Sequence, residues 1–425
     1  MKLINARILQ DMIQPLRRMG MKKKHIFSLA VGVCSIVVLL QTANGAQSAP
    51  DTIVFGQALC LTGFQSPAAK AIEVSLGDLW VEEVNRKGGL FVPQYNKRIP
   101  IKIIRYDDAS DPGKGLGLYE RLITVDKVHL TLPPHGSGWN VAAAPITNKY
   151  KQPWVLCTSS SMKFKEQVHK FPYIFLHTQY PTDQMPALAD LMAEVGVKSA
   201  AVLFIAAEFG LQNIQIITPL LPTRGIEVPV LKSYPPGPTD LSPLLKSAQA
   251  ANVDAVVVLS YPVDTFLALE QAISLDYTPK LLFLGVGSTW AVMKKKYGVD
   301  AIEGILTPGG WHRKLNPEAE DFYNKWMAKY GFDPDMWGGG YGYSSLQVLE
   351  QAIERVGFAD KDKLRNAIAT GTFKTVIGSV KYVDQFNVTH PAQITQWQKG
   401  GIELVAPPKS RTAQPIYPKP PWPKK

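Results

Sequence analysis

The chain has 425 residues, of which 46% are hydrophobic and 19% are charged, a balance typical of a globular protein and not of a disordered one. Because one domain seldom grows to this length, we expect two lobes. The formal net charge is +11, but residues 1–45 contribute seven basic residues and one acidic residue to it, which leaves +5 for the rest. No basic patch interleaved with aromatic residues remains, so a nucleic-acid partner is not expected.

The first 49 residues are not expected to belong to the fold. Lys22–Lys24 is followed by the apolar run Ile26–Leu40, which at about 15 residues is too short to cross a membrane comfortably. Ala43 and Gly45 are small residues at the positions that precede a signal-peptidase cut. The sequence therefore predicts a signal peptide over residues 1–45, cleaved after Gly45, and an exported protein. An uncleaved N-terminal anchor is the alternative.

Strands and helices alternate along the next part of the chain. A buried strand is expected over 52–58, and apolar residues at helical spacing predict a helix over 68–86 that stops at Gly88 and Gly89. Further strands are expected at 99–106, 128–132 and 154–157, with a helix at 115–125. This alternation predicts a parallel sheet with helical crossovers, and therefore an α/β fold.

The same alternation restarts near residue 180 and predicts a second lobe. Helices are expected at 185–195, 213–224, 240–251 and 266–275, and strands at 200–205, 255–259 and 281–284. The later segments resemble exchanges between lobes: an extended stretch at 305–313, helices at 317–330, 344–355 and 361–369, and strands at 376–383 and 394–398. The Pro/Lys-rich end, 407–425, predicts an extended strap along the surface.

One stretch, Val128–Asn140, has the pattern of an anion-binding turn. The strand 128–132 ends in two prolines, a glycine- and serine-containing loop follows, and Asn140 is placed to cap a helix. Such a turn directs backbone N–H groups and a hydroxyl toward one point, where anions bind readily. In open α/β sheets, ligands collect at the carboxyl ends of strands. A plain connection that binds nothing is the alternative.

Several short motifs, in this order, resemble one protein family. They are Leu61-Thr62-Gly63, the Asn-Arg-Lys-Gly-Gly run 85–89, the Tyr-Asp-Asp-Ala-Ser-Asp-Pro run 106–112, the Thr-Asp-Leu-Ser-Pro run 239–243 and Val376-Ile377-Gly378. Together they are similar to the periplasmic leucine/isoleucine/valine-binding proteins, the type I solute-binding class that serves ABC importers. The resemblance covers about Asp51 to Lys399.

The resemblance implies two Rossmann-like lobes joined by three crossovers, with a ligand in the cleft between them. The first lobe would comprise 51–178 plus 309–376, the second 179–308 plus 377–405, and 406–425 would be the tail. The crossovers would fall near Leu176–Thr182, Thr307–Trp311 and Thr375–Gly378.

The resemblance also implies a set of ligand-binding residues. Ser137, Gly138 and Trp139 lie in the loop that holds the ligand carboxylate in this family, and Thr158, Ser159 and Ser160 lie in a second such loop. Phe209 matches an aromatic residue that covers the ligand, and Tyr261 matches another in the cleft.

Two departures from the family bear on the ligand. Gly287 stands where the family has an acid that pairs with the ligand ammonium, and a buried ammonium without a counter-charge is expensive. Trp139 stands where the family often has a small residue. A carboxylate without an ammonium, such as an aromatic acid or an oxo acid, therefore fits better than an α-amino acid. Ser110 stands where the family has a cysteine, so the family's disulfide is not expected. Cys60 and Cys157 are expected to be buried free thiols, because the strands that they follow need not be neighbours in this topology.

The sequence thus predicts a periplasmic solute-binding protein that is monomeric and has no cofactor, no metal and no enzymatic activity. Its partners would be a small-molecule solute and the permease subunits of an ABC importer. The runner-up is a ligand-sensing receptor subunit with the same fold. An enzyme is the least favoured class, because no nucleophile or partner motif accompanies His135 or His177. Asp107 and Asp108 are expected to stabilise a capped turn.

Overall fold

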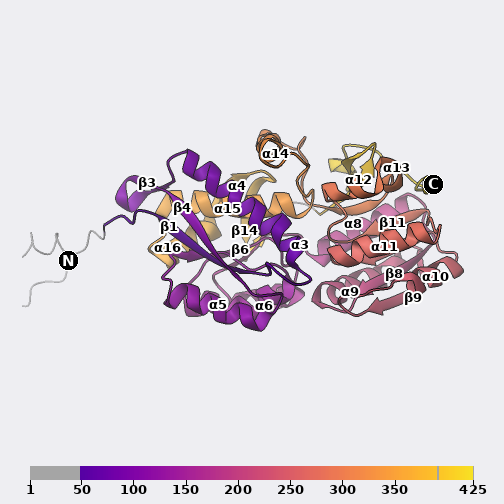
Figure 1. The fold of residues 1–425 in the computed structure, drawn as a ribbon, viewed down its shortest axis with the longest axis horizontal. Helices are drawn as coiled ribbons and strands as arrows, with labels where there is room; N and C mark the ends of the chain where they lie inside the picture. The colour runs from indigo at the N-terminus through magenta and orange to yellow at the C-terminus, as the bar shows by residue number, and fades with distance from the viewer. Residues whose placement is uncertain (1–47, 390–391, 425) are drawn as a thin grey trace, which may run out of the picture. The chain divides into compact units, whose positions relative to one another are not determined.

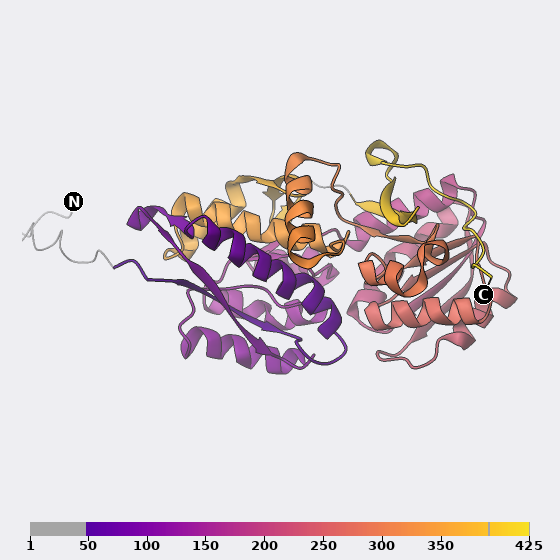
Figure 2. The ribbon, with the colours of Figure 1, turned by 45° about the horizontal axis from the view of Figure 1, so that its top comes forward.

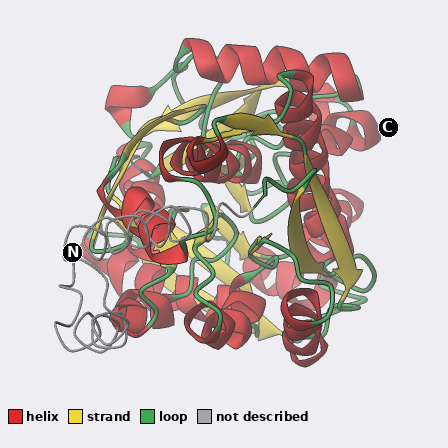
Figure 3. Cartoon of the chain, turned by 90° about the vertical axis from the view of Figure 1, so that its left-hand side faces the viewer, coloured by secondary structure: helices red, strands yellow, loops and turns green. Residues whose placement is uncertain are grey.

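The structure is a computed structural model that describes residues 48–389 and 392–424. The predicted signal peptide lies outside the described residues. Figure 3 shows strands flanked by helices, the layered arrangement expected of an α/β fold. No helix in the described part of the chain is long and apolar enough to cross a membrane.

The first lobe is built from segments at both ends of the fold, and Figure 1 shows α15 and α16 beside β1 and α4. Its strands are β1 (Ile53–Leu59), β2 (Leu90–Val92), β3 (Lys97–Ile99), β4 (Ile101–Asp107), β5 (Leu130–Thr131), β6 (Trp154–Leu156), β7 (Ile174–Leu176), β13 (Thr372–Thr375), β14 (Gly378–Val383) and β15 (Phe386–Asn387). Its larger helices are α4 (Ser75–Arg86), α5 (Pro112–Thr124), α6 (Ser137–Lys149), α14 (Pro317–Tyr330), α15 (Gly338–Val356) and α16 (Lys361–Thr370). Shorter turns are α3 (Ser66–Ala69), the π-helical η1 (Lys70–Val74), η2 (Pro93–Tyr95), α7 (Met162–Gln167) and η3 (Val168–Lys170).

Strand pairing in the first lobe is parallel at its centre. The strands form the ordered groups β4-β1-β5 and β13-β14-β15-β7-β6, and β1 pairs in parallel with β4 and β5. Side chains connect the two groups where backbone pairing lapses: the Gln152 amide oxygen accepts from Thr131 N at 2.9 Å, and Trp154 Nε1 donates to Thr131 Oγ1 at 2.8 Å. These bonds satisfy polar groups that are fully buried.

The second lobe has one seven-stranded sheet in the order β17-β16-β12-β11-β10-β8-β9. Its strands are β8 (Ser199–Ile205), β9 (Glu227–Tyr234), β10 (Ala255–Leu259), β11 (Leu281–Leu284), β12 (Leu306–Gly309), β16 (Gln393–Gln398) and β17 (Gly401–Ala406). Its helices are α8 (Pro181–Glu194), α9 (Glu208–Thr223), α10 (Ser242–Ala250), α11 (Pro262–Ser274), α12 (Ala291–Tyr297), α13 (Val299–Ile302) and the short η4 (Pro408–Ser410). The central strands are apolar throughout because helices cover both faces of the sheet.

The chain passes between the sheets three times, and the third passage differs from the expectation. The first lies between β7 and α8, and the second follows β12, both as predicted. The third was expected at Thr375–Gly378, which would place 377–405 in the second lobe. That boundary is wrong, because β14 and β15 remain in the first lobe, where Phe386 pairs in parallel with Leu176. The chain crosses after β15, before β16 joins the second sheet.

The C-terminal segment lies along the second lobe, as predicted, and Figure 2 shows it at that lobe. Lys419 N donates to Lys280 O at 2.7 Å, and the buried Trp422 donates through Nε1 to Tyr277 O at 3.0 Å. The strap therefore contributes an aromatic side chain to the lobe that it covers.

The two remaining cysteines and the acidic turn also match the prediction. Cys60 and Cys157 are buried free thiols. Asp107 accepts from Leu61 N at 3.0 Å and from Thr62 Oγ1 at 2.7 Å, and so fastens the turn that follows β1 to the turn that follows β4. Asp111 caps α5 by accepting from Gly113 N at 2.8 Å. Asp108 accepts from Ser110 N at 2.8 Å, so all three aspartates hold turns of this motif.

Candidate functional site

A cavity of about 40 Å³ lies among the loops that follow the strands of both lobes. The first lobe lines it from the ends of β5 and β6, and the second lobe lines it from the ends of β8, β10 and β11. The lining residues are Ile72, His135, Gly136, Ser137, Cys157, Thr158, Ser160, Thr178, Phe209, Tyr261, Val286, Trp337 and Gly338. The carboxyl ends of the strands thus converge on one point, where α/β proteins bind their ligands.

Helix α6 begins at this cavity, with its N-cap four residues earlier than predicted. Gly136 is the N-cap, with a φ of 89° that favours glycine, and Ser137 is the first helical residue. The prediction that Asn140 caps the helix is wrong: its side-chain amide instead donates to Pro134 O and Gly136 O, both at 2.9 Å. The N-cap supplies no side chain to the first-turn N–H groups, which leaves a partially positive helix end at the cavity.

Two hydroxyl groups organise the first-lobe wall. Ser137 Oγ accepts from Ser160 N at 3.2 Å, which ties the loop after β5 to the loop after β6. Because that bond uses a lone pair, the Ser137 hydroxyl hydrogen stays available to an acceptor in the cavity. Thr158 Oγ1 donates to Glu73 Oε1 at 2.9 Å and accepts from Gly136 N at 3.3 Å. The wall therefore offers an anion one hydroxyl donor beside the start of α6.

A buried acid–histidine pair stands behind this wall. Glu73, in the π-helical turn η1, contacts His135 Nδ1 through both carboxylate oxygens, at 2.8 and 3.0 Å. Both side chains are buried, so each provides the partner that a buried polar group needs. Sequence reasoning missed Glu73. Its signal was an acid within the predicted helix 68–86, next to Ile72, where the neighbouring residues are apolar.

Aromatic rings from both lobes form the other wall. The ring centroids of Phe209 and Tyr261 are 5.6 Å apart, and Trp337 lies 6.4 Å from Phe209. Phe64, on the turn after β1, does not line the cavity, but its ring centroid lies 6.4 Å from that of Tyr261 and 6.0 Å from that of Trp139. These separations are in the range of favourable aromatic pairs. The rings of Phe64 and Trp337 were not anticipated from the sequence, because both residues lie in turns without a periodic pattern.

The family model for periplasmic binding proteins matches residues 52–401. The chain belongs to this family. This chain is 24% identical over 405 residues to "Leu/Ile/Val-binding protein homolog 7" of Brucella suis biovar 1 (strain 1330), and the alignment covers 91% of this chain and 97% of the relative. The resemblance to leucine/isoleucine/valine-binding proteins is thereby confirmed.

Solved structures share the two-lobed fold of this periplasmic binding protein. The branched-chain amino acid transporter substrate binding protein from Streptococcus pneumoniae, in complex with isoleucine, aligns with a TM-score of 0.73 and 20% identity, covering 84% of this chain and all of that one. A solute binding protein of an ABC transporter from R. palustris, in complex with benzoate, aligns with a TM-score of 0.74 and 19% identity, and the alignment covers 86% of this chain and 98% of that one. These comparisons confirm the predicted fold class.

Of the nine site residues predicted for this periplasmic binding protein, five line the cavity: Ser137, Thr158, Ser160, Phe209 and Tyr261. The other four do not line it: Gly138, Ser159 and Gly287 are next to lining residues in the sequence, and Trp139 is two residues from Ser137. Trp139 is buried and packs on Phe64 and on the backbone of Gly136. Their part in binding stays a prediction.

Gly287 has a local structural reason to be glycine. Its φ is 88°, and a Cβ there would lie 3.0 Å from the Pro262 side chain. An acid at this position would therefore require a different turn in this periplasmic binding protein. Asp335, which lies close to the aromatic wall, is already engaged, since Oδ1 accepts from Thr289 Oγ1 and from Trp337 N, and Oδ2 accepts from Gly338 N. Burial raises the pKa of Asp335.

Metal binding finds no support in the described residues, where no group of three or more His, Cys, Asp or Glu side chains is placed to hold an ion. Burial also raises the pKa of the Tyr261 phenol, which is protonated at neutral pH even at its ordinary pKa. The site combines hydroxyl groups, a helix start and aromatic faces, which is an arrangement for binding.

Proposed function

We propose that the chain is the periplasmic solute-binding component of an ABC importer and that its solute is an aromatic carboxylate. The carrying observation is the juxtaposition of the α6 start and the Ser137 hydroxyl with the rings of Phe209, Tyr261 and Trp337 around one cavity. Backbone N–H groups and a hydroxyl match a carboxylate, and aromatic faces match a ring. The family membership supports the solute-binding role, and the benzoate complex of a structural relative supports an aromatic carboxylate as the solute.

The acids near the site weigh against an α-amino acid. An ammonium group needs a carboxylate that is free to receive it. Asp335 accepts backbone and hydroxyl donors through both of its oxygens, and Gly287 has no side chain to contribute. Glu73 is held by His135 and Thr158. An unsubstituted aromatic carboxylate, which has no ammonium, needs none of these groups to change partners.

The cavity volume requires the lobes to part when solute enters. A water molecule needs about 10–15 Å³ on this measure, so about 40 Å³ holds roughly three waters and no aromatic ring. We infer that solute enters when the lobes separate and that bound solute favours a closed form. The closed form would then dock on a membrane permease. A signal peptide and a periplasmic location belong to the same proposal.

A branched-chain amino acid is the second candidate, and Glu73 is the observation that favours it. Its carboxylate is buried directly behind the cavity wall, and His135 and Thr158, which contact it, both line the cavity. A ligand ammonium could replace His135 as its partner. The isoleucine complex of a structural relative and the Leu/Ile/Val-binding relatives support this reading.

One titration separates the two candidates. Isothermal titration calorimetry of the mature protein would use benzoate and leucine, with Glu73→Gln as the variant and Glu82→Gln, an exposed acid on α4, as the matched control. We expect benzoate to bind and leucine not to, and Glu73→Gln to retain benzoate affinity within about threefold. The loss of one charge-assisted hydrogen bond would weaken an ammonium ligand by about 10- to 100-fold. Leucine binding that is abolished in Glu73→Gln alone would establish the second candidate instead.

A further inference from the structure

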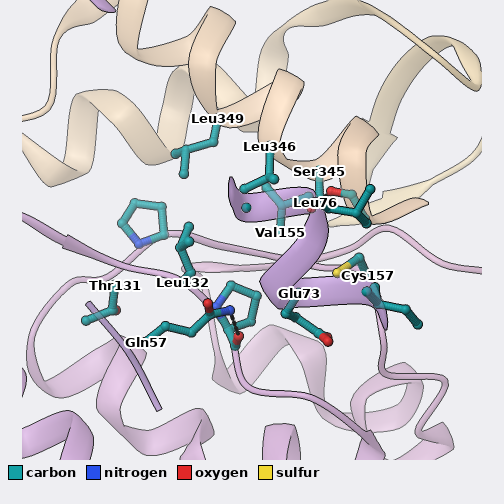
Figure 4. Close-up of a pocket in the computed structure, with 15 residues that line it drawn as sticks. Gln57, Glu73, Leu76, Thr131, Leu132, Val155, Cys157, Ser345, Leu346 and Leu349 are labelled. Carbon is teal, nitrogen blue, oxygen red and sulfur yellow. Dashed lines mark hydrogen bonds between the residues drawn. The ribbon is translucent and has the colours of Figure 1, made fainter. Parts of the chain in front are cut away.

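A second cavity of about 30 Å³ lies inside the first lobe. We call it the inner chamber. Residues from β1, β5, β6, η1 and α4 enclose it together with α15. Figure 4 shows Leu346 and Leu349 of α15 on one side of it and Gln57 and Thr131 on the opposite side. Most of its walls are aliphatic, and such walls alone would make the chamber an ordinary packing void.

The inner chamber shares a wall with the cleft cavity. Ile72 and Cys157 line both spaces, and Glu73 lines the chamber while its partners His135 and Thr158 line the cleft. Ile72, Cys157 and Glu73 therefore belong to the partition between the two spaces, and Glu73 is held there by hydrogen bonds with His135 and Thr158. A rotation of Glu73 away from His135 would connect the chamber with the cleft.

One polar group that lines the chamber, the side-chain amide of Gln57, has unused acceptor capacity. Gln57 is 3% exposed, and its Oε1 finds no hydrogen-bond partner among the described residues, while its Nε2 donates to Pro133 O at 2.9 Å. The hydroxyl hydrogens of Thr131 and Ser345 are already donated, to Gln152 Oε1 and Gly342 O. A buried acceptor without a donor is costly, and it rewards whatever donor fills the space.

We propose that the inner chamber is a specificity subsite that receives a hydroxyl substituent of the aromatic acid bound in the cleft. The substituent donates to Gln57 Oε1, and the ring and carboxylate remain in the cleft. The volume of about 30 Å³ admits a substituent of one or two heavy atoms and not a second ring. A methyl group of similar size would fill the space and leave the acceptor unpaired. The inference rests on the proposed binding of aromatic carboxylates.

The test compares Kd values by calorimetry for benzoate, 3- and 4-hydroxybenzoate, and 3- and 4-methylbenzoate. In the wild-type protein, one hydroxybenzoate should bind about tenfold more tightly than its methyl analogue, the usual effect of pairing one buried acceptor. Gln57→Met keeps the side-chain length and removes the acceptor. This variant should abolish the preference for hydroxyl over methyl and leave benzoate affinity within about threefold.

A second variant tests the space instead of the acceptor. Val155→Ile adds a methylene group to the chamber wall, and Val202→Ile, in the β8 core of the second lobe, is the matched control. Val155→Ile should weaken both substituted acids about tenfold and spare benzoate, while Val202→Ile spares all of them. If the acids bind but hydroxyl preference survives Gln57→Met, or Val155→Ile affects every acid equally, the chamber is only a void. If no benzoate binds to the wild-type protein, the proposed function fails and the subsite fails with it.

Discussion

Two adjacent glycines at the start of α15 should respond in opposite directions to the same substitution. A Cβ at Gly340 would lie 2.3 Å from Trp311 Cγ, a separation that real structures essentially never show. At Gly339 the nearest atom, Trp311 Nε1, would be 3.6 Å away, an ordinary contact. Trp311 cannot yield easily, because it is fully buried, stacks edge-on against Phe322 and donates through Nε1 to Asp335 O at 2.8 Å.

The free energies follow from these distances. Gly340→Ala forces either the helix or the indole to shift, and overpacking of this kind lowers the free energy of unfolding by about 1–3 kcal/mol. Gly339→Ala fits, and it removes conformational freedom from the unfolded chain, so it should raise the free energy of unfolding by about 0.5 kcal/mol. With urea m-values near 3 kcal/mol per M, the two unfolding midpoints should differ by about 0.5–1 M.

The assay is urea unfolding of both variants and the wild-type protein, followed by tryptophan fluorescence and by circular dichroism. Two probes are needed because a two-lobed chain need not unfold in one transition. Equal midpoints for Gly340→Ala and Gly339→Ala would refute the argument that Trp311 excludes a side chain at position 340. A destabilised Gly339→Ala would show that the first turn of α15 needs glycine for its backbone and not for its packing.

Two further predictions concern an aspartate and the C-terminal strap. Burial raises the pKa of Asp108 to about 6, so the stability that its protonated form contributes is present below about pH 4 and is lost as pH rises through 6. Relative to Asp108→Asn, the wild-type protein should therefore lose up to about 3 kcal/mol between pH 4 and pH 7, and urea midpoints that differ by the same amount at both pH values would contradict this. Trp422→Ala removes the bond to Tyr277 O and should release the strap, so the Lys419 amide hydrogen, which is bonded to Lys280 O, should exchange with solvent much faster than in the wild-type protein, whereas equal exchange rates in both proteins would contradict that anchoring role.

Hydrophobic periodicity, together with the glycines and prolines that end helices and strands, predicted most of the fold from the sequence. Continuous apolar runs such as 255–259 and 281–284 became strands with the predicted bounds, because strands covered by helices on both faces need no polar alternation. The predicted starts of helices were wrong where the local backbone conformation, and not the hydrophobic periodicity, decides where the helix begins. Helix α6 starts at Ser137 because Gly136 adopts a positive φ, and α15 starts at Gly338, six residues before the predicted start at 344.

The site was predictable only where it consists of loop motifs. Ser137, Thr158 and Ser160 follow strands in the sequence, and the sheet order then brings them together. Glu73 could not be found in this way, because its place in the site depends on its contact with His135, which lies 62 residues away along the chain. The third crossover was misplaced for a related reason: the two-residue strand β15 is too short to show a pattern, yet its pairing with β7 decides the lobe.

The position of Glu73 links the two parts of the binding proposal. Its carboxylate lies between the cleft cavity and the inner chamber, and it is fixed by groups that belong to the cleft wall. The two kinds of solute would need different things of Glu73. An amino acid, whose ammonium displaces His135, needs the charge of Glu73. An aromatic acid that places a hydroxyl in the inner chamber needs only that Glu73 moves. Glu73→Gln preserves the shape and removes the charge. The same variant therefore separates an amino-acid site from an aromatic-acid site through chemistry at one carboxylate, without any assumption about how far the lobes close.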